Sequence, residues 1–145
     1  MALLDKRIEV RAPPQAVFEF LAHVERMPRW KPGELRVARL TEARGKGAVV
    51  HHETEACGTR LSMDAVIEDW QPGKRLAWRQ QQGDWARNQG AWELKATKQG
   101  TVVRIVADLE LPHTLDVEVT AEEAALDLSH GLDMALLNLK DELEG

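Results

Sequence analysis

The sequence predicts an α+β fold in which a curved antiparallel sheet of seven strands wraps around one long C-terminal helix. Two observations carry this prediction. Residues 120–143 form an amphipathic stretch with a helical period, and residues 34–111 alternate between apolar and polar side chains. Turn motifs interrupt the alternating region about every ten residues, which is typical of antiparallel hairpins. Such a sheet has one inner face to bury, and the apolar stripe of the helix is its natural cover. The curvature leaves a gap that is either filled by large side chains or kept as a cavity.

The chain begins with a strand and two short helical segments. Residues 6–11 alternate as a strand, with Ile8 and Val10 on one face. The pair Pro13-Pro14 ends this strand and starts a helix, because proline suits a first helical turn. The apolar stripe of this helix comprises Val17, Phe20, Leu21 and Val24. The prolines and glycine around Trp30 predict a short helical turn followed by a loop over residues 30–33.

Six further strands follow, separated by turns at residues 44–47, 57–58, 71–74, 83–84 and 98–100. Each strand has one apolar face, as expected of a sheet with its core on one side. The inner faces comprise Leu61, Met63, Ala65 and Ile67; Leu76, Trp78 and Gln80; Asn88, Gly90, Trp92 and Leu94; and Val103, Ile105, Ala107, Leu109 and Leu111. The pair Pro112-His113 ends the sheet, and we expect a loop to lead from there to the long helix.

The long helix is predicted over residues 120–143. Thr120 and Glu123 form a Thr-x-x-Glu capping box, in which each side chain accepts a hydrogen bond from an amide at the helix start. One face carries Ala125, Leu128, Leu132, Ala135, Leu136, Leu139 and Leu143. Gly131 lies in mid-helix, where glycine costs about 1 kcal/mol relative to alanine. It is either a tolerated surface glycine, or it marks a kink or the close approach of a ligand or strand.

Composition narrows the class of protein. The 145 residues are expected to form one domain spanning residues 1–145. The net charge of −5 argues against a nucleic-acid partner, since such proteins carry basic patches. A single cysteine, Cys57, excludes an intrachain disulfide and fits a reducing compartment. We see no apolar run suited to a signal peptide or a membrane span, and expect a cytoplasmic protein.

No catalytic or metal-binding motif stands out, and we predict no cofactor. The two serines lie in no Gly-x-Ser-x-Gly motif, and the neighbours Ser129 and His130 point about 100° apart on a helix. His51 and His52 are adjacent in a strand, so only one can face inward. His52 shares its face with the more apolar residues and is the candidate, although the register of this strand stays open. Further ligands at metal-binding spacing are missing, so we predict no metal site.

Several short phrases, spread over essentially the whole chain, carry a family resemblance. They occupy residues 8–13, 27–30, 68–76, 83–85, 90–92, 99–103 and 138–140. In this order they resemble the START-like SRPBCC superfamily, which includes polyketide cyclases/dehydrases and lipid-transport proteins. The Gly-Asp-Trp and Gly-Ala-Trp phrases are similar to its coenzyme-Q-binding branch. The resemblance implies a helix-grip fold with a deep apolar cavity between the sheet and the C-terminal helix.

We therefore expect a non-enzymatic protein that binds a lipid, an isoprenoid quinone or a polyketide-like aromatic in that cavity. Ligand access would require the loop over residues 30–33 to open. The candidate ligand-binding residues are Trp30, His52, Met63, Ile67, Trp78, Gln80, Asn88, Trp92, Ile105, Leu128, Leu132 and Leu136. For Trp30, Trp78 and Trp92, core packing is the competing explanation, and Trp85 is expected at the cavity rim or as an exposed contact.

Two alternatives stay open. The first is an enzyme of the cyclase/dehydratase kind with His52 or Asp69 as general base. Residues 66–68 and Asn88 depart from the serine, arginine and tyrosine that such relatives are expected to carry, which weakens this reading. The second is a module with a filled cavity that binds a partner of the respiratory chain or a chaperone. A transient membrane contact and the oligomeric state are left undecided.

Overall fold

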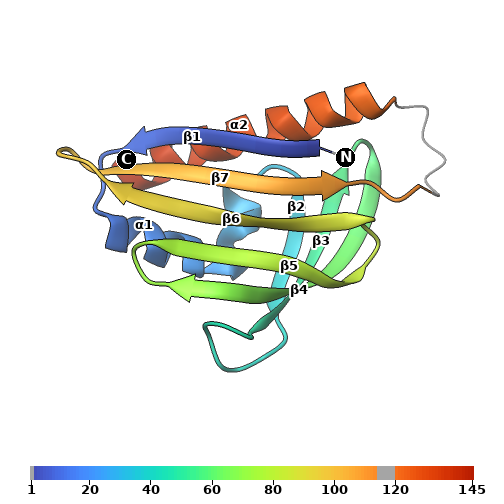
Figure 1. Ribbon diagram of the computed structural model, residues 1–145, viewed down its shortest axis with the longest axis horizontal. Helices are drawn as coiled ribbons and strands as arrows, with labels where there is room; N and C mark the ends of the chain where they lie inside the picture. The colour runs from blue at the N-terminus through green and yellow to red at the C-terminus, as the bar shows by residue number, and fades with distance from the viewer. Residues whose placement is uncertain (1, 114–119) are drawn as a thin grey trace.

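The computed structural model of the chain describes residues 2–113 and 120–145. The elements are β1 (Ala2–Val10), α1 (Pro14–Ala22), the 3-10 helix η1 (Val24–Arg29), β2 (Glu34–Arg39), β3 (Val49–Ala56), β4 (Thr59–Gln71), β5 (Arg75–Gly83), β6 (Arg87–Ala96), β7 (Thr101–Glu110) and α2 (Ala121–Glu144). The strands form one antiparallel sheet in the order β1-β7-β6-β5-β4-β3-β2 (Figure 1). The predicted fold class is confirmed: a seven-stranded sheet, a long C-terminal helix and two short helices after the first strand. Residues 114–119 of the predicted loop before α2 lie outside the described residues.

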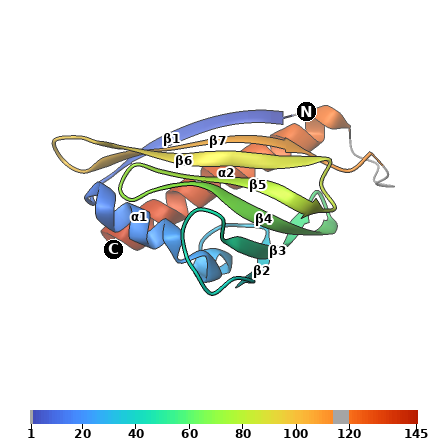
Figure 2. The ribbon, with the colours of Figure 1, turned by 60° about the horizontal axis from the view of Figure 1, so that its bottom comes forward.

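Irregular pairing along the longest strand explains the curvature of the sheet. The pairing of β4 with β5 shifts its register between Asp64 and Ala65 and again between Ile67 and Asp69. Each such bulge bends a strand and increases its twist. Figures 1 and 2 show α1 and α2 on the same side of the curved sheet, with β2 and β3 forming one of its ends.

The C-terminal half of α2 holds the helix to the rest of the protein. Its buried residues are Leu132, Ala135, Leu136 and Leu139. The amide Nδ2 of Asn138 donates to the carbonyl oxygen of Trp30 at 2.9 Å, and Nζ of Lys140 donates to the carbonyl oxygen of Glu9 at 3.0 Å. In the N-terminal half, Leu128 is only half-buried and Leu126 is 71% exposed. The helix is therefore packed at one end and stands off from the core at the other.

The main differences from the sequence prediction lie near the N-terminus. The first strand begins at Ala2 rather than at residue 6, and it pairs with β7 as far as Val10. The start of this strand cannot be recognised from the alternation of apolar and polar residues, because Leu3 is apolar like its neighbour Leu4 and yet is exposed. In α1 the inner face includes Phe18, whose ring meets that of Trp70 edge to face at 5.1 Å between centroids. The predicted turn at residues 44–47 is part of a longer loop between Arg39 and Val49.

The predicted capping box is confirmed at the start of α2. The hydroxyl of Thr120 accepts from the amide of Glu123 at 3.1 Å, and the carboxylate of Glu123 accepts from the amide of Thr120 at 3.4 Å. The helix continues through Gly131, where an added Cβ would meet no atom within 4 Å. No described strand comes within 4 Å of that Cβ position, so the suggestion that Gly131 marks the close approach of a strand is wrong.

We predict that Gly131→Ala stabilises the protein by about 0.5–1 kcal/mol, because alanine loses less backbone entropy in a helix and finds open space here. Urea unfolding followed by far-UV circular dichroism measures the change. Gly90→Ala serves as the opposite control: its Cβ would lie 2.4 Å from the carbonyl oxygen of Val106, so this variant should be destabilised. A Gly131→Ala protein no more stable than the wild type would contradict the prediction.

Candidate functional site

A cavity of about 690 Å³ lies between the N-terminal half of α2 and the inner face of the sheet. This volume is within the usual range for small-molecule sites. Strands β2 to β7 supply much of its wall, and residues of η1, of the loop before β2, of the β3–β4 turn, of the segment after β5 and of the 127–132 region of α2 complete it. Apolar side chains predominate, among them Val50, Ala65, Leu76, Ala107 and Leu109.

The structure brings eight of the twelve predicted residues together on the cavity wall. They are His52, Ile67, Trp78, Asn88, Trp92, Ile105, Leu128 and Leu132. Four others lie outside the wall: Trp30, Met63, Gln80 and Leu136. Three of these four belong to the packed core, where Trp30 is 3% exposed and its ring lies 5.9 Å from that of Trp92.

Gln80 does not line the cavity, and its side chain instead bonds to the backbone of Trp85. Its amide Nε2 donates to the carbonyl oxygen of Trp85 at 2.8 Å, and its Oε1 accepts from the amide of Trp85 at 3.2 Å. These two bonds hold the segment after β5 so that the Trp85 ring turns inward. Trp85 is 5% exposed and lines the cavity, so the expectation of an exposed contact is wrong.

The register of β3 places His52 inward. It pairs with Val37 of β2 and Met63 of β4, is 8% exposed and lines the cavity. His51 faces the other side of the sheet, where its Nδ1 lies 2.7 Å from Oδ1 of Asp64.

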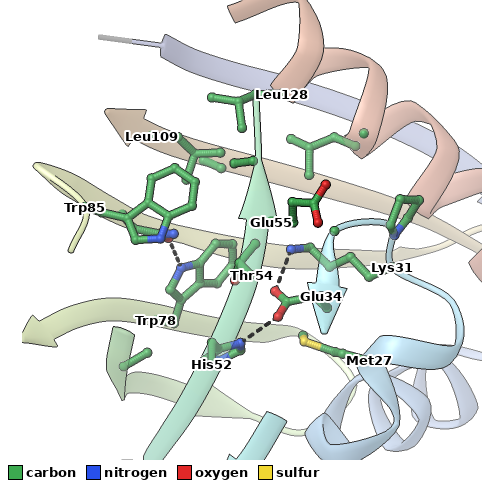
Figure 3. A pocket seen from close by; sticks show the side chains of 18 of the residues that line it. Met27, Lys31, Glu34, His52, Thr54, Glu55, Trp78, Trp85, Leu109 and Leu128 are labelled. Atoms are coloured by element: carbon green, nitrogen blue, oxygen red, sulfur yellow. Dashed lines mark hydrogen bonds and ion pairs between the residues drawn. The ribbon is translucent and has the colours of Figure 1, made fainter. Parts of the chain in front are cut away.

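A buried carboxylate beside His52 was missed by sequence reasoning. Glu34 is 7% exposed; its Oε2 lies 3.2 Å from Nδ1 of His52, and its Oε1 lies 3.0 Å from Nζ of Lys31. Figure 3 shows the three side chains in a row along the cavity. The β2–β3 pairing shifts between Glu34 and Arg36, so Leu35 and Arg36 are both exposed while Glu34 turns inward. A strict two-residue alternation cannot reveal such a bulge.

The surroundings of Glu34 keep it ionised. Burial is the largest single influence and would raise its pKa. The charge of Lys31 and the hydrogen bond from His52 are the main opposing influences, and the net result is a pKa lowered to about 2. A carboxylate only accepts hydrogen bonds, so Nδ1 of His52 must carry the proton in this contact. In the neutral imidazole, Nε2 is then a lone-pair acceptor.

A second polar group lies farther along the sheet. Nε1 of Trp78 donates to Oδ1 of Asn88 at 2.9 Å, and because an indole only donates, this bond fixes which way the amide points. The Trp78 ring lies over Gly90, where an added Cβ would come within 2.8 Å of it. Nε1 of Trp85 is buried and has no hydrogen-bond partner among residues 2–113 and 120–145. In Figure 3 this nitrogen is on the side of the ring nearest Trp78. The NH2 group of Asn88 and the indole N–H of Trp85 are the donors that this region offers.

The β3–β4 turn and α2 meet at one side of the cavity, where Cys57, Gly58 and Asp127 all belong to the wall. Cys57 and Gly58 form the turn with φ angles of 52° and 76°. The amide and thiol of Cys57 lie 3.3 and 3.5 Å from Oδ2 of Asp127, which ties the turn to the helix. Burial, followed by the bond to Asp127, raises the pKa of the Cys57 thiol to about 11, so the thiol is a poor nucleophile.

The loop over residues 30–33, expected to open for a ligand, lines the cavity through Lys31, Pro32 and Gly33. The carbonyl oxygen of Gly33 accepts from the amide of Glu55 at 2.7 Å. Opening this loop would therefore require a backbone hydrogen bond to break.

Asp69, the other candidate base, is absent from the cavity wall. Its Oδ2 lies 2.7 Å from both Nη1 of Arg75 and Nε2 of Gln71. The hydrogen bond from Arg75 is the main cause that lowers its pKa, which makes it a weaker base. This candidate is wrong for chemistry inside the cavity.

Within the described residues, no group of three or more histidine, cysteine or acidic side chains could hold a metal ion. No helix in the same ranges is long and apolar enough to cross a membrane.

Comparison with known proteins gives a consistent family assignment. The sequence profile described as "Polyketide cyclase / dehydrase and lipid transport" matches residues 1–144. No match was found among curated proteins. A START superfamily protein from Mycobacterium smegmatis is similar over 99% of this chain and 98% of its own, with a TM-score of 0.81 and 15% identity.

Two other solved structures are comparably similar. A protein from Thermus thermophilus has a TM-score of 0.85 and 15% identity over 98% of this chain and 97% of its own. The Zhui aromatase/cyclase from a Streptomyces species has a TM-score of 0.80 and 21% identity over 98% of this chain and 93% of its own. At these identities the likeness shows the fold alone. The narrower likeness to the coenzyme-Q-binding branch stays a prediction.

We predict that Glu34 contributes an acid-sensitive part of the stability. Its pKa is about 2 in the folded protein against an ordinary 4.5, so the stabilisation is complete above about pH 4.5 and is lost as the pH falls toward 2. The loss should be on the order of 3 kcal/mol. Glu34→Gln should lack this part of the pH dependence when urea unfolding is measured between pH 7 and pH 2.

Other carboxylates also titrate in this range, so the informative quantity is the difference between the wild-type and variant curves. Glu42→Gln is the matched control, because Glu42 is exposed in the loop before β3. Its curve should run parallel to that of the wild type. A Glu34→Gln curve that does the same would refute the assignment.

Proposed function

The chain belongs to the polyketide cyclase/dehydrase and lipid transport family, and on this premise we propose that it binds a hydrophobic small molecule in the cavity beneath α2. The observation that carries the proposal is the cavity itself: about 690 Å³, walled mainly by apolar side chains, in a fold of the START type. A lipid, an isoprenoid quinone and a polyketide-like aromatic are the ligand classes that suit it.

Removal of apolar surface from water would supply the affinity. At about 25 cal/mol per Å², a ligand that buries about 300 Å² of apolar surface gains roughly 7 kcal/mol before the costs of association. Ile67, Trp92 and Ile105 would contact it from the sheet, and Leu128 and Leu132 from the helix. The polar groups of His52 and Asn88 would orient it.

Catalysis in the same cavity is the second candidate. It is favoured by the contact between Glu34 and His52, because a carboxylate that orients an imidazole is a common arrangement for a general base. The aromatase/cyclase from Streptomyces shares the fold. His52→Ala separates the two readings, since it should abolish turnover by an enzyme but only alter the affinity of a carrier. A partner-binding module with a filled cavity fits less well, because the cavity is present.

Extraction of the freshly purified protein with organic solvent, followed by mass spectrometry, tests the proposal. A stoichiometric lipid, quinone or aromatic would support binding and would identify the ligand class. An empty protein that also fails to bind added apolar dyes would count against it.

We predict that Ala107→Phe weakens the binding of Nile red, a neutral apolar dye, at least fivefold. Ala107 is buried on the cavity wall, so a phenyl ring there occupies space that the dye needs. Fluorescence titration in visible light measures the affinity, and circular dichroism checks the fold. Ala96→Phe is the control, since Ala96 is exposed at the end of β6. Equal affinities of the two variants would show that the dye binds elsewhere.

A further inference from the structure

The contact between Glu34 and His52 has a chemical consequence for whatever occupies the cavity. Oε2 of Glu34 lies 3.2 Å from Nδ1 of His52, and Lys31 holds the other oxygen at 3.0 Å. The carboxylate is thus fixed from both sides and faces the imidazole as an acceptor. Nδ1 is committed to Glu34, whereas Nε2 has no hydrogen-bond partner among the residues that the structure describes.

This nitrogen is not sealed inside the core. Nε1 of Trp30 and Nε1 of Trp85 are fully buried without a hydrogen-bond partner, whereas Nε2 of His52 is not among such atoms and therefore keeps some accessible surface. His52 lines the cavity, and its side chain keeps 10% of its surface exposed. A ligand in the cavity therefore meets an imidazole whose free nitrogen, in the neutral ring, can only accept a hydrogen bond.

The charged side chains along the wall also favour a neutral ligand over an anionic one. Within the described part of the chain, Lys31 is the one lysine or arginine on the wall, which also carries His52 and the exposed His130, against the three carboxylates of Glu34, Glu55 and Asp127. Nζ of Lys31 is already paired with Glu34. An anionic headgroup would meet these carboxylates without an unpaired lysine or arginine on the described wall to receive it.

We propose that Glu34 and His52 make the cavity selective for neutral ligands that carry a hydroxyl group, which donates its hydrogen bond to Nε2 of His52. The inference rests on the proposed binding function and specifies its ligand class. Glu34 acts as a positioning residue: its two oxygens are engaged by His52 and Lys31, and its contact with Nδ1 sets which ring nitrogen of His52 carries the proton. An oxygen at the far end of the ligand can accept from the NH2 group of Asn88 or the buried indole N–H of Trp85.

Three pyrenes that differ in one substituent test the selectivity: 1-hydroxypyrene, 1-methoxypyrene and pyrene-1-carboxylate, each titrated at pH 7. The ether keeps the flat apolar body but cannot donate, and the carboxylate is anionic. We expect the wild type to bind the hydroxyl compound at least tenfold more tightly than either of the others, because an unpaired buried acceptor is costly. Equal binding of the phenol and the ether would overturn this inference alone. Binding of neither would contradict the proposed binding function itself.

Two variants test the residues. His52→Phe should bind 1-methoxypyrene as the wild type does and should prefer the hydroxyl compound by less than twofold. Glu34→Gln replaces the fixed acceptor by an amide that can also donate, so both imidazole tautomers become available. Its preference should fall at least threefold. Glu42→Gln, a change of the same kind at an exposed carboxylate away from the wall, should keep the full preference.

Long-range ¹H–¹⁵N NMR of histidine-labelled protein reports directly which tautomer His52 adopts. A Glu34→Gln variant that only loosened the structure would leave this tautomer unchanged. We expect a neutral His52 protonated at Nδ1 in the wild type and a mixed population in Glu34→Gln. A wild-type His52 protonated at Nε2, or a Glu34→Gln protein with unchanged tautomer and preference, would overturn the role of Glu34. If Glu34→Gln does not fold, His52→Phe still decides the selectivity.

Discussion

The burial of α2 in the core toward its C-terminus alone is the constraint on which the cavity depends. Leu132, Leu136 and Leu139 are buried, and Asn138 and Lys140 bond to backbone carbonyls of distant segments. Toward its N-terminus the same helix has no comparable burial and roofs an open space. A straight helix cannot stay in contact with a sheet that curls away from it, so dense packing at one end leaves a void at the other.

The polar groups in this void are held by partners outside the space that a ligand would occupy. Glu34 orients His52, Trp78 orients Asn88, and Gln80 positions Trp85 through its backbone. Groups that are already fixed lose little freedom when a ligand arrives, so the entropic cost of recognition is low. Burial of the Glu34 carboxylate would destabilise the fold without compensating partners, and Lys31 and His52 are those partners.

The sequence was sufficient wherever the determinant is local. The capping box and the leucine spacing placed α2 within one residue at each end, and the alternation from Leu61 to Ile67 identified the inner face of β4. Glu34 could not be found in this way, because its inward direction comes from a bulge that exists only in the pairing with β3. The sequence also could not show that Trp30 lies in the core and Trp85 on the cavity wall, since this depends on which end of the helix is packed.

The absence of tyrosine beside five tryptophans gives the protein an optical property that follows from its architecture. Trp78, Trp85 and Trp92 line the cavity, whereas Trp30 and Trp70 do not. All near-ultraviolet emission arises from indole, and three of the five emitters stand within contact distance of any occupant. An occupant that absorbs where indole emits would therefore quench the intrinsic fluorescence, including that of Trp30, whose ring lies 5.9 Å from that of Trp92. The fold thus carries its own reporter of occupancy, with no label added.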